Sequence, residues 1–455
     1  MEQQSGRPGP PPGCPATGST RLYGPRFGAE PDTYYEHLRD LGPSAPVDVA
    51  PGVRVELVTS YDAALYILQN PAWFVRDSRR WTAWNEGRVP ADSPALPMMG
   101  YRPNALFSDG AAHARLRLAV TESLAHLDEL RLAHLTQRCA SYLISRLGTE
   151  QPGRAELMAE YARPLPLLVF GELFGCPPAI WDRVIAGISG IFAGTAGADQ
   201  SLGEALGELI SLKRSRPDTD LTSRLMQHSA NLSDEEVLHQ LVTLLSGGTA
   251  PSAALIGTAG ALVLGEGWHT DLPVEDAVNQ ALWNYSPIAN YAAHYPTQDV
   301  ELGGRILRAN DPVLISFAAA NTDPRLAEHR ERLSAKAHLA YGAGPHACPA
   351  KDAALTIAVT ALETLLKQLP DVTTRVPFED LDWVPTPWSR SLVALPVEFT
   401  APAAVPSPER RETAPPDPRS PAPARPAAQQ EPAAGPRPGL FSRFLAWTRR
   451  SDQGG

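Results

Sequence analysis

The sequence predicts a mainly helical α+β chain with one small β-sheet on its N-terminal side. Apolar residues recur at helical spacing over several long segments, and the strand-like segments are fewer and shorter. Hydrophobic residues make up 43% of the 455 residues and charged residues 20%. This balance is typical of a globular protein that buries a sizeable core.

The expected helices share this apolar spacing. One of them opens at a capping box, Ser233-x-x-Glu236, in which each side chain pairs with a backbone N–H group of the other residue. Another, over 351–367, follows a loop rich in glycine and proline. The other predicted helices, in chain order, are 31–41, 113–124, 128–147, 156–173 and 204–213.

The expected strands are short runs of strand-forming residues that are bounded by turn residues. They lie at 53–59, 299–308, 312–316 and 391–399. The sequence shows no internal repeat, so a solenoid or propeller is not expected.

Proline sets both ends of the chain apart. Residues 1–22 hold five prolines and residues 402–438 hold twelve. Such stretches bury too little apolar surface to fold on their own. We therefore expect a disordered tail over 1–22, a folded domain over 23–400, a disordered linker over 401–438 and a short basic amphipathic segment over 439–455.

The segment 439–450 has the pattern of a short amphipathic helix. Five apolar residues can share one side, and three arginines lie opposite or at the end: Leu440, Phe441, Phe444, Leu445 and Trp447, then Arg443, Arg449 and Arg450. A basic amphipathic helix on a tether is typical of docking to a membrane surface or a partner. The alternative is a frayed tail, because so short a helix is unstable alone.

Charge and composition narrow the class of protein. The formal net charge of −10 argues against a nucleic-acid binder. No run of 18 apolar residues predicts a membrane span, and the N-terminus has no apolar signal core. The four cysteines, Cys14, Cys139, Cys176 and Cys348, show no paired spacing. We expect a cytoplasmic protein, peripheral to a membrane only if the terminal segment binds one.

Cys348 is the most informative single residue. It lies in a loop shaped by glycine and proline, directly before the predicted helix 351–367. The N-terminus of a helix favours negative charge, so we expect the pKa of this thiol to be lowered. A thiolate placed there can be a nucleophile or an axial ligand of haem iron. The alternative is a buried structural cysteine after a turn.

The loop Tyr341-Gly-x-Gly-x-His-x-Cys348 resembles the haem-binding loop of the cytochrome P450 monooxygenases. Tyr341 stands where that family usually has Phe, and Ala350 where it usually has Gly. The resemblance runs from about residue 23 to residue 399. It implies the triangular, mainly helical P450 fold, haem b (iron protoporphyrin IX) as cofactor and Cys348 as the iron ligand.

The resemblance also implies roles for further residues. Gly342 and Gly344 would let the backbone approach the porphyrin, and His346 would reach a haem propionate. His113 and Arg117, spaced to share one helix face, match a propionate-binding His-x-x-x-Arg of the family. His294 stands where the family usually has a basic propionate ligand, and its alternative is an ordinary strand-edge histidine.

The sequence departs from the family in three places. Gln280 and Trp283 stand for the Glu and Arg of the Glu-x-x-Arg motif, so we expect a buried Gln amide and a packed Trp to replace that ion pair. This substitution resembles an actinobacterial subgroup of the family. The segment between Asp323 and His338 is also shorter than the family's meander, and the resemblance places it at the surface where an electron donor docks.

The third departure lies on the helix that the resemblance places over the haem. Gly247 keeps its position, but Thr249 and Ala250 replace the acid and alcohol that guide protons. Thr249 or Ser252 is the remaining candidate for holding a water, and Pro251 should kink the helix. General acid–base delivery is worth ~10²–10⁴-fold, so its weakening matters for activity.

Three functional hypotheses follow. The leading one is a haem-thiolate monooxygenase that inserts one oxygen atom from O2 into a small lipophilic substrate, with electrons from a ferredoxin and its reductase. The second is a haem-binding sensor or interaction protein with little oxygenase activity, whose partners in the subgroup would be a small GTPase and sensor-kinase-like proteins. The third is a haem-free scaffold.

Overall fold

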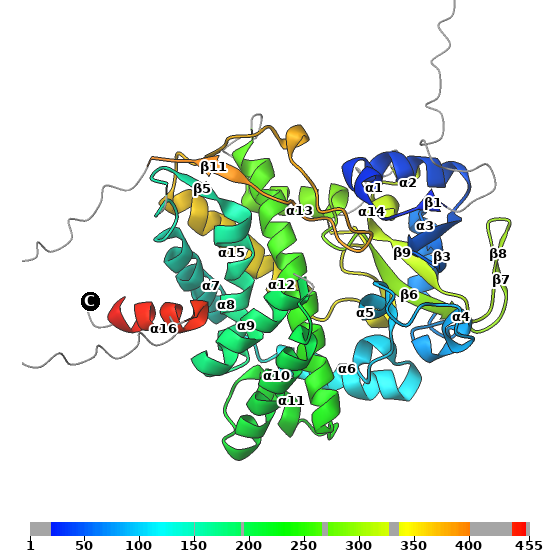
Figure 1. Cartoon of the computed structure of the whole chain (residues 1–455), viewed down its shortest axis with the longest axis horizontal. Coiled ribbons are helices and arrows are strands. Elements are labelled where there is room, and N and C mark those ends of the chain that lie inside the picture. The colour runs from blue at the N-terminus through cyan, green and yellow to red at the C-terminus, as the bar shows by residue number, and fades with distance from the viewer. Residues whose placement is uncertain are drawn as a thin grey trace, which may run out of the picture.

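The computed structural model describes residues 20–149, 151–192, 195–265, 272–326, 336–400 and 439–451. A helix-rich part and a smaller part built on a β-sheet lie side by side, with the long helix α12 (Asp234–Leu264) running through the middle (Figure 1). The predicted tail and linker, 1–22 and 401–438, fall almost wholly outside the described residues and stay a prediction.

The main sheet joins strands that are far apart in the sequence. Its order is β1-β2-β3-β9-β6-β4, with β1 parallel to β2, β3 parallel to β9 and the other neighbours antiparallel. The bounds are β1 Thr20–Arg21, β2 Ser44–Ala50, β3 Val53–Val58, β9 Val313–Ser316, β6 Asn290–Pro296 and β4 Phe74–Val75. The predicted strands 53–59 and 312–316 are therefore confirmed as two adjacent central strands.

Two small sheets complete the β-structure. One has the order β10-β11-β5 and the other is the hairpin β7-β8, with bounds β10 Thr373–Thr374, β11 Pro396–Glu398, β5 Arg154–Glu156, β7 Val300–Leu302 and β8 Arg305–Leu307. The predicted strand 299–308 is wrong as one strand, because Gly303 and Gly304 both have positive φ and turn the chain. The predicted strand 391–399 is confined to β11.

The helices carry the larger core, and α12 contacts α8, α10, α13 and α15 within it. The helical bounds are α1 Pro25–Ala29, α2 Pro31–Asp40, α3 Tyr61–Gln69, α4 Thr82–Asn85, α5 Leu96–Met99, α6 Gly110–Leu124, α7 Glu129–Ile144, α8 Pro164–Leu173, α9 Pro178–Phe192, α10 Ala198–Ser215, α11 Leu221–Gln227, α13 Val274–Asn284, α14 Phe317–Asn321 and α15 Lys351–Gln368. The predicted helices are confirmed except at 156–173. There the chain ends β5, makes a π-helical turn (Met158–Ala162) and only then enters α8.

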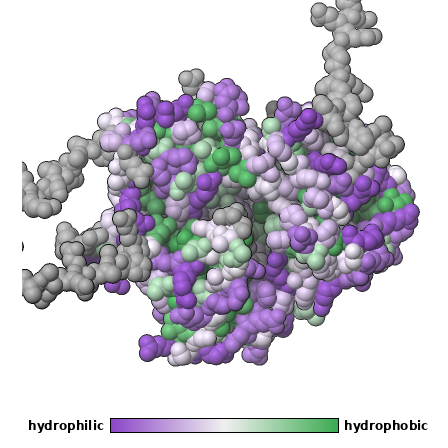
Figure 2. All heavy atoms as spheres, in the orientation of Figure 1, coloured by the Kyte–Doolittle hydropathy of each residue, from purple (hydrophilic) through white to green (hydrophobic). Residues whose placement is uncertain are grey.

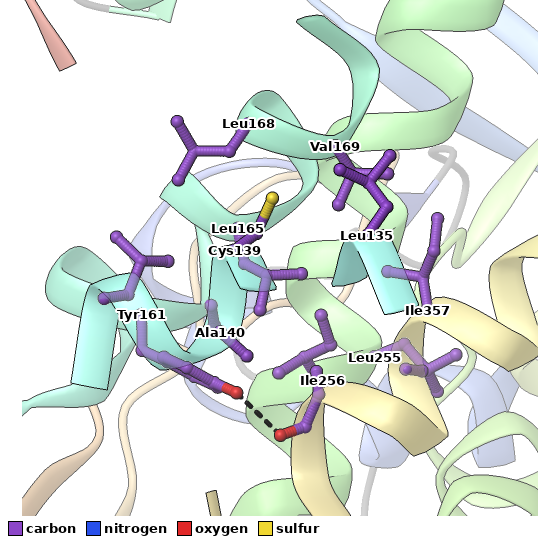
Figure 3. Close-up of a cluster of buried hydrophobic side chains, with 14 of the residues drawn as sticks. Leu135, Cys139, Ala140, Tyr161, Leu165, Leu168, Val169, Leu255, Ile256 and Ile357 are labelled. Atoms are coloured by element: carbon purple, nitrogen blue, oxygen red, sulfur yellow. Dashed lines mark hydrogen bonds between the residues drawn. The ribbon is translucent and has the colours of Figure 1, made fainter. Parts of the chain in front are cut away.

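One cluster of buried side chains in this core lies where α7, α8, α12 and α15 meet (Figure 3). Apolar side chains from all four helices converge there, and the Tyr161 hydroxyl donates a hydrogen bond of 2.6 Å to the backbone carbonyl of Ala361. Burial raises the pKa of Tyr161 well above its usual value, so the phenol stays a neutral donor. This bond ties the turn before α8 to α15, the helix that follows Cys348.

Helix α12 opens at the predicted capping box. Ser233 accepts from the Glu236 backbone N–H at 3.1 Å, and Glu236 accepts from the Ser233 N–H at 2.9 Å. The helix is continuous through Pro251. By length and apolar composition it could cross a membrane, but 67% of its most apolar window is buried inside the domain, so it is a core helix.

Hydrophilic residues dominate the visible face of the molecule (Figure 2).

The C-terminal helix α16 (Leu440–Ser451) packs on the domain itself, against α7, α8 and α9. Phe441 and Phe444 are 1% and 0% exposed, and both pack in the larger core. Asp182 of α9 caps the helix by accepting from the Phe441 N–H at 2.9 Å. The frayed-tail alternative is therefore wrong. The membrane- or partner-docking alternative is also not what the structure shows, because the apolar face is already covered.

Candidate active site

The loop before α15 holds Cys348 in a tight, glycine-dependent turn. The Cys348 N–H donates to the Tyr341 carbonyl at 2.8 Å and closes the turn. Gly342 and Gly344 have φ of 68° and 67°, which a residue with a side chain rarely adopts. A Cβ on Gly344 would also lie 2.1 Å from the Leu68 carbonyl oxygen, so the loop sits directly against α3.

Burial dominates the chemistry of the thiol. It raises the pKa of Cys348, and the Ala350 backbone N–H and the Arg117 charge only partly oppose it. The expected lowering of this pKa by the helix N-terminus is therefore wrong for the protein groups alone, because the sulfur is taken out of water. A metal would reverse the balance, since a coordinating thiol is deprotonated outright.

Four predicted basic residues gather beside the thiol. The imidazoles of His113 on α6 and His346 in the loop lie 3.9 Å apart between ring centroids. Arg117, one turn along α6, donates from Nη2 to the Ala347 carbonyl. His294 reaches the group from β6, beside an irregularity in its pairing with β9. Because β6 lies between β9 and β4, the strand-edge alternative for His294 is wrong.

These groups act on one another electrostatically. Burial, followed by the charges of Arg76, His113, His294 and Arg117, lowers the pKa of His346 to about 2. Burial and Arg117 likewise lower the pKa of His113. Both imidazoles are consequently neutral at physiological pH and can act as hydrogen-bond donors beside two permanent cations.

Arg76 is a member of this group that sequence reasoning missed. It follows β4 and is 3% exposed. In the sequence it begins the run Arg-Asp-Ser-Arg-Arg, which has the composition of a solvated turn. Arg76 is buried because β4 pairs with β6, a strand more than two hundred residues further along the chain, and this pairing cannot be predicted from the local sequence. A buried arginine whose charge acts on His113 and His346 indicates an anion site.

This set of residues fits a haem. Within the described part of the chain, Nε2 of His113 and Nη1 of Arg76 are buried without a hydrogen-bond partner. Buried donors of this kind are normally satisfied, so they point to an acceptor such as a carboxylate. A haem carries two carboxylates and an iron that binds thiolate, and the site offers clustered donors next to a thiol.

Helix α12 contributes the positions predicted to face the cofactor. Gly247 is exposed, and a Cβ there would meet nothing within 4 Å. Thr249 and Ser252 are each 5% exposed, and the Thr249 hydroxyl donates to the Leu245 carbonyl at 2.8 Å. The proton of Thr249 is thus engaged within its own helix, whereas the exposed neighbour, Ala250, has no polar group.

The helix α13 stands where the missing Glu-x-x-Arg pair would be. Trp283 is 5% exposed and meets the ring of His338 edge-on. Gln280, in contrast, is exposed. The expectation of a buried Gln amide is therefore wrong, because position 280 faces away from the side of α13 that carries Ala277, Ala281 and the rest of its buried residues.

Asn321 supplies the polar link that Gln280 does not. Its Nδ2 donates to the Leu282 carbonyl of α13 at 3.3 Å, and its Oδ1 accepts from the Leu339 N–H at 2.7 Å. Asn321 is 1% exposed, so both bonds are buried. One neutral side chain at the end of α14 thereby joins α13 to the start of the Cys348 loop. The shortened meander lies mostly outside the described residues, at 327–335.

Comparisons with known proteins agree with this arrangement, although no family model matches the chain. The cytochrome P450 monooxygenase PikC of Streptomyces venezuelae is 30% identical over 397 residues, covering 83% of this chain and 92% of that protein. The nocardicin C N-oxygenase of Nocardia uniformis is also 30% identical, over 80% of this chain and 94% of its own.

Solved structures show the same fold. The structure of CYP154A1 from Streptomyces coelicolor A3(2) superimposes with a TM-score of 0.72 at 27% identity, covering 84% of this chain and all of that one. A myxobacterial P450, CYP267B1, in complex with myristic acid gives 0.72 at 25% identity. Together with the thiol loop, the basic cluster and the long central helix, these similarities show that the chain belongs to the cytochrome P450 family of monooxygenases.

Proposed function

We propose that this chain binds haem b through Cys348 and inserts one oxygen atom from O2 into a small lipophilic substrate. The observation that carries the proposal is the convergence of Cys348 with His113, Arg117, His294 and His346. A thiolate-ligated haem supplies O2 activation, with two electrons and two protons reducing the second oxygen atom to water.

The side chains of the protein would bind the haem, orient the substrate and shield both from water. Arg117, His113, His346 and His294 would hold the propionates, and Gly342 and Gly344 would let the backbone of the loop approach the ring. The face of α12 at Gly247 would border the substrate. Thr249 or Ser252 would position a water there, and the engaged Thr249 proton limits that residue to accepting.

A second function is favoured by a specific observation. The face of α12 carries Ala250 in place of an alcohol and Thr249 in place of an acid. A chain that keeps the haem cluster but delivers protons poorly would serve as a haem-binding sensor or interaction protein. Its partners would then be a small GTPase and sensor-kinase-like proteins, and its location the cytoplasm.

The first test is a reduced, CO-bound difference spectrum of the purified protein beside Cys348→Ser. We expect a Soret band at the thiolate-ligated position that the variant loses. Absence of haem, or a band typical of a histidine or neutral-thiol ligand, would contradict the proposal. Turnover with a surrogate ferredoxin and ferredoxin reductase then separates the two functions, because only the monooxygenase converts electrons into oxidised product.

A further inference from the structure

The buried guanidinium group of Arg76 makes few contacts with other protein groups. Its Nε donates to the Leu106 carbonyl at 3.3 Å, and its guanidinium lies 6.0 Å from the centroid of the Tyr291 ring. Within the described residues, Nη1 has no hydrogen-bond partner, although the side chain is almost wholly buried. The guanidinium therefore keeps unused donor capacity.

Asp109 is the acid whose charge acts on Arg76, but no ion pair joins the two side chains among the described residues. Asp109 accepts hydrogen bonds from the backbone N–H of Arg76, at 2.8 and 3.0 Å, and from that of Asp77, at 3.0 Å. Its carboxylate is thus committed to the main chain at the start of α6. Burial raises the pKa of Tyr291, so its hydroxyl stays protonated and offers no negative charge to Arg76.

A buried guanidinium stays protonated, so its charge must be compensated. Leaving a buried charge without a partner is strongly destabilising, which makes an uncompensated buried arginine rare. The charge of Arg76 contributes more than any other to lowering the pKa of His346, and it also lowers the pKa of His113. The unused donor accordingly lies beside the same cluster that flanks Cys348.

We propose that Arg76 binds a carboxylate at the edge of the candidate haem site. Two sources share this chemistry, a haem propionate and the carboxylate of an acidic substrate such as a fatty acid. A guanidinium is suited to both because its N–H groups form a planar fork that matches a carboxylate. This inference rests on the proposed haem site, and it adds a fifth basic group to the four expected ones.

The test compares the haem-loaded full-length protein with Arg76→Gln and Arg76→Lys. Arg79→Gln is the matched control, because Arg79 is three residues away, exposed and paired with Asp77 at 2.7 Å. Two quantities are measured: the rate of haem transfer to excess apomyoglobin, and the binding of myristate against methyl myristate by the shift of the Soret band.

The two sources give different results. A hydrogen bond to a charged group contributes about 1.5–3 kcal/mol, or roughly 10–100-fold in affinity. If Arg76 holds a propionate, Arg76→Gln speeds haem loss by about this factor. If it holds a substrate carboxylate, haem loss is unchanged and the preference for myristate over its ester disappears. In either case Arg76→Lys shows a smaller change than Arg76→Gln, and Arg79→Gln shows no change.

The proposal is overturned if Arg76→Gln changes neither quantity, or changes them no more than Arg79→Gln. If Arg76→Gln does not fold, Arg76→Lys decides by its haem-loss rate and its ester discrimination. If the wild-type chain takes up no haem, the proposed function fails separately. The thermal shift with myristate then tests Arg76, and equal shifts in wild type and variant would reject carboxylate binding.

Discussion

The ring of Trp283 meets the imidazole of His338 edge to face, with centroids 5.8 Å apart and planes at 87°. His338 in turn lies 5.8 Å from Tyr341, the first residue of the Cys348 loop. A row of three aromatic rings therefore connects α13 to the loop. The edge-to-face pair of Trp283 and His338 contributes about 0.5–1.5 kcal/mol beyond the area that it buries.

Removing the first ring should loosen the loop. Trp283→Ala is expected to lower the free energy of unfolding by about 3–5 kcal/mol and to shift the CO-bound spectrum away from the thiolate position. Trp283→Phe should keep most of both. Restoring the family pair with Gln280→Glu and Trp283→Arg should not rescue stability, because position 280 faces solvent and leaves the arginine buried alone. Chemical denaturation with parallel spectra checks this, and a stable, thiolate-ligated double variant would contradict it.

His338 should make stability depend on pH in the acid range. Burial, with a contribution from the Lys351 charge, lowers its pKa from 6.5 to about 4. Above pH 6.5 the imidazole is neutral in both states, so its contribution to stability is fully present. As the pH falls from 6.5 to about 4, the unfolded chain takes up a proton first, and about 3 kcal/mol is lost. The denaturation midpoint should depend less on pH over this range in His338→Phe than in the wild type. An equal dependence in both proteins would refute the assignment of this pH effect to His338.

Gly344 and Gly247 make a matched pair for substitution. Gly344→Ala places a Cβ 2.1 Å from the Leu68 carbonyl oxygen at a φ of 67°. The left-handed conformation alone costs roughly 1–2 kcal/mol, so the variant should lose stability and haem. Gly247→Ala meets nothing within 4 Å and should be at least as stable as wild type, because alanine favours helices. Thermal melts and the haem-to-protein absorbance ratio measure both, and equal behaviour of the two variants would count against the described loop.

The docked helix α16 should contribute to the stability of the domain. Phe444→Ala empties a fully buried position and is expected to cost about 3–5 kcal/mol, whereas Arg443→Ala changes an exposed residue and should cost little. Asp182→Ala removes the cap of the helix and should cost about 1 kcal/mol. Urea denaturation of the three variants tests this order. If Phe444→Ala matched Arg443→Ala, the helix would not be docked in solution.

Sequence reasoning succeeded where the evidence is local. The capping box at Ser233, the spacing of His113 and Arg117, and the loop around Cys348 are each contained in a few consecutive residues. Local spacing fixes which side chains share a helix face or a turn. The confirmed helices, all but 156–173, and the two central strands are predictable for the same reason.

The failures share the opposite cause. Arg76 is buried by a strand pairing, Gln280 is exposed by the rotation of α13 against the core, and Asn321 gains its role from two partners that are distant in sequence. The pKa of Cys348 was misjudged because the helix N-terminus is visible in the sequence and the loss of water around the sulfur is not. Tertiary contacts decide all four.

The surface on which α16 packs has a consequence for the synthesis of the protein. Gly171 leaves room for the Phe441 ring, since a Cβ there would lie 2.7 Å from it, and Trp181 packs against the same ring. The ribosome makes α16 only after α7, α8 and α9 and after the 38 residues 401–438. A domain that folds during synthesis therefore leaves this aromatic surface open to water, where chaperones or neighbouring nascent chains can reach it until the helix docks.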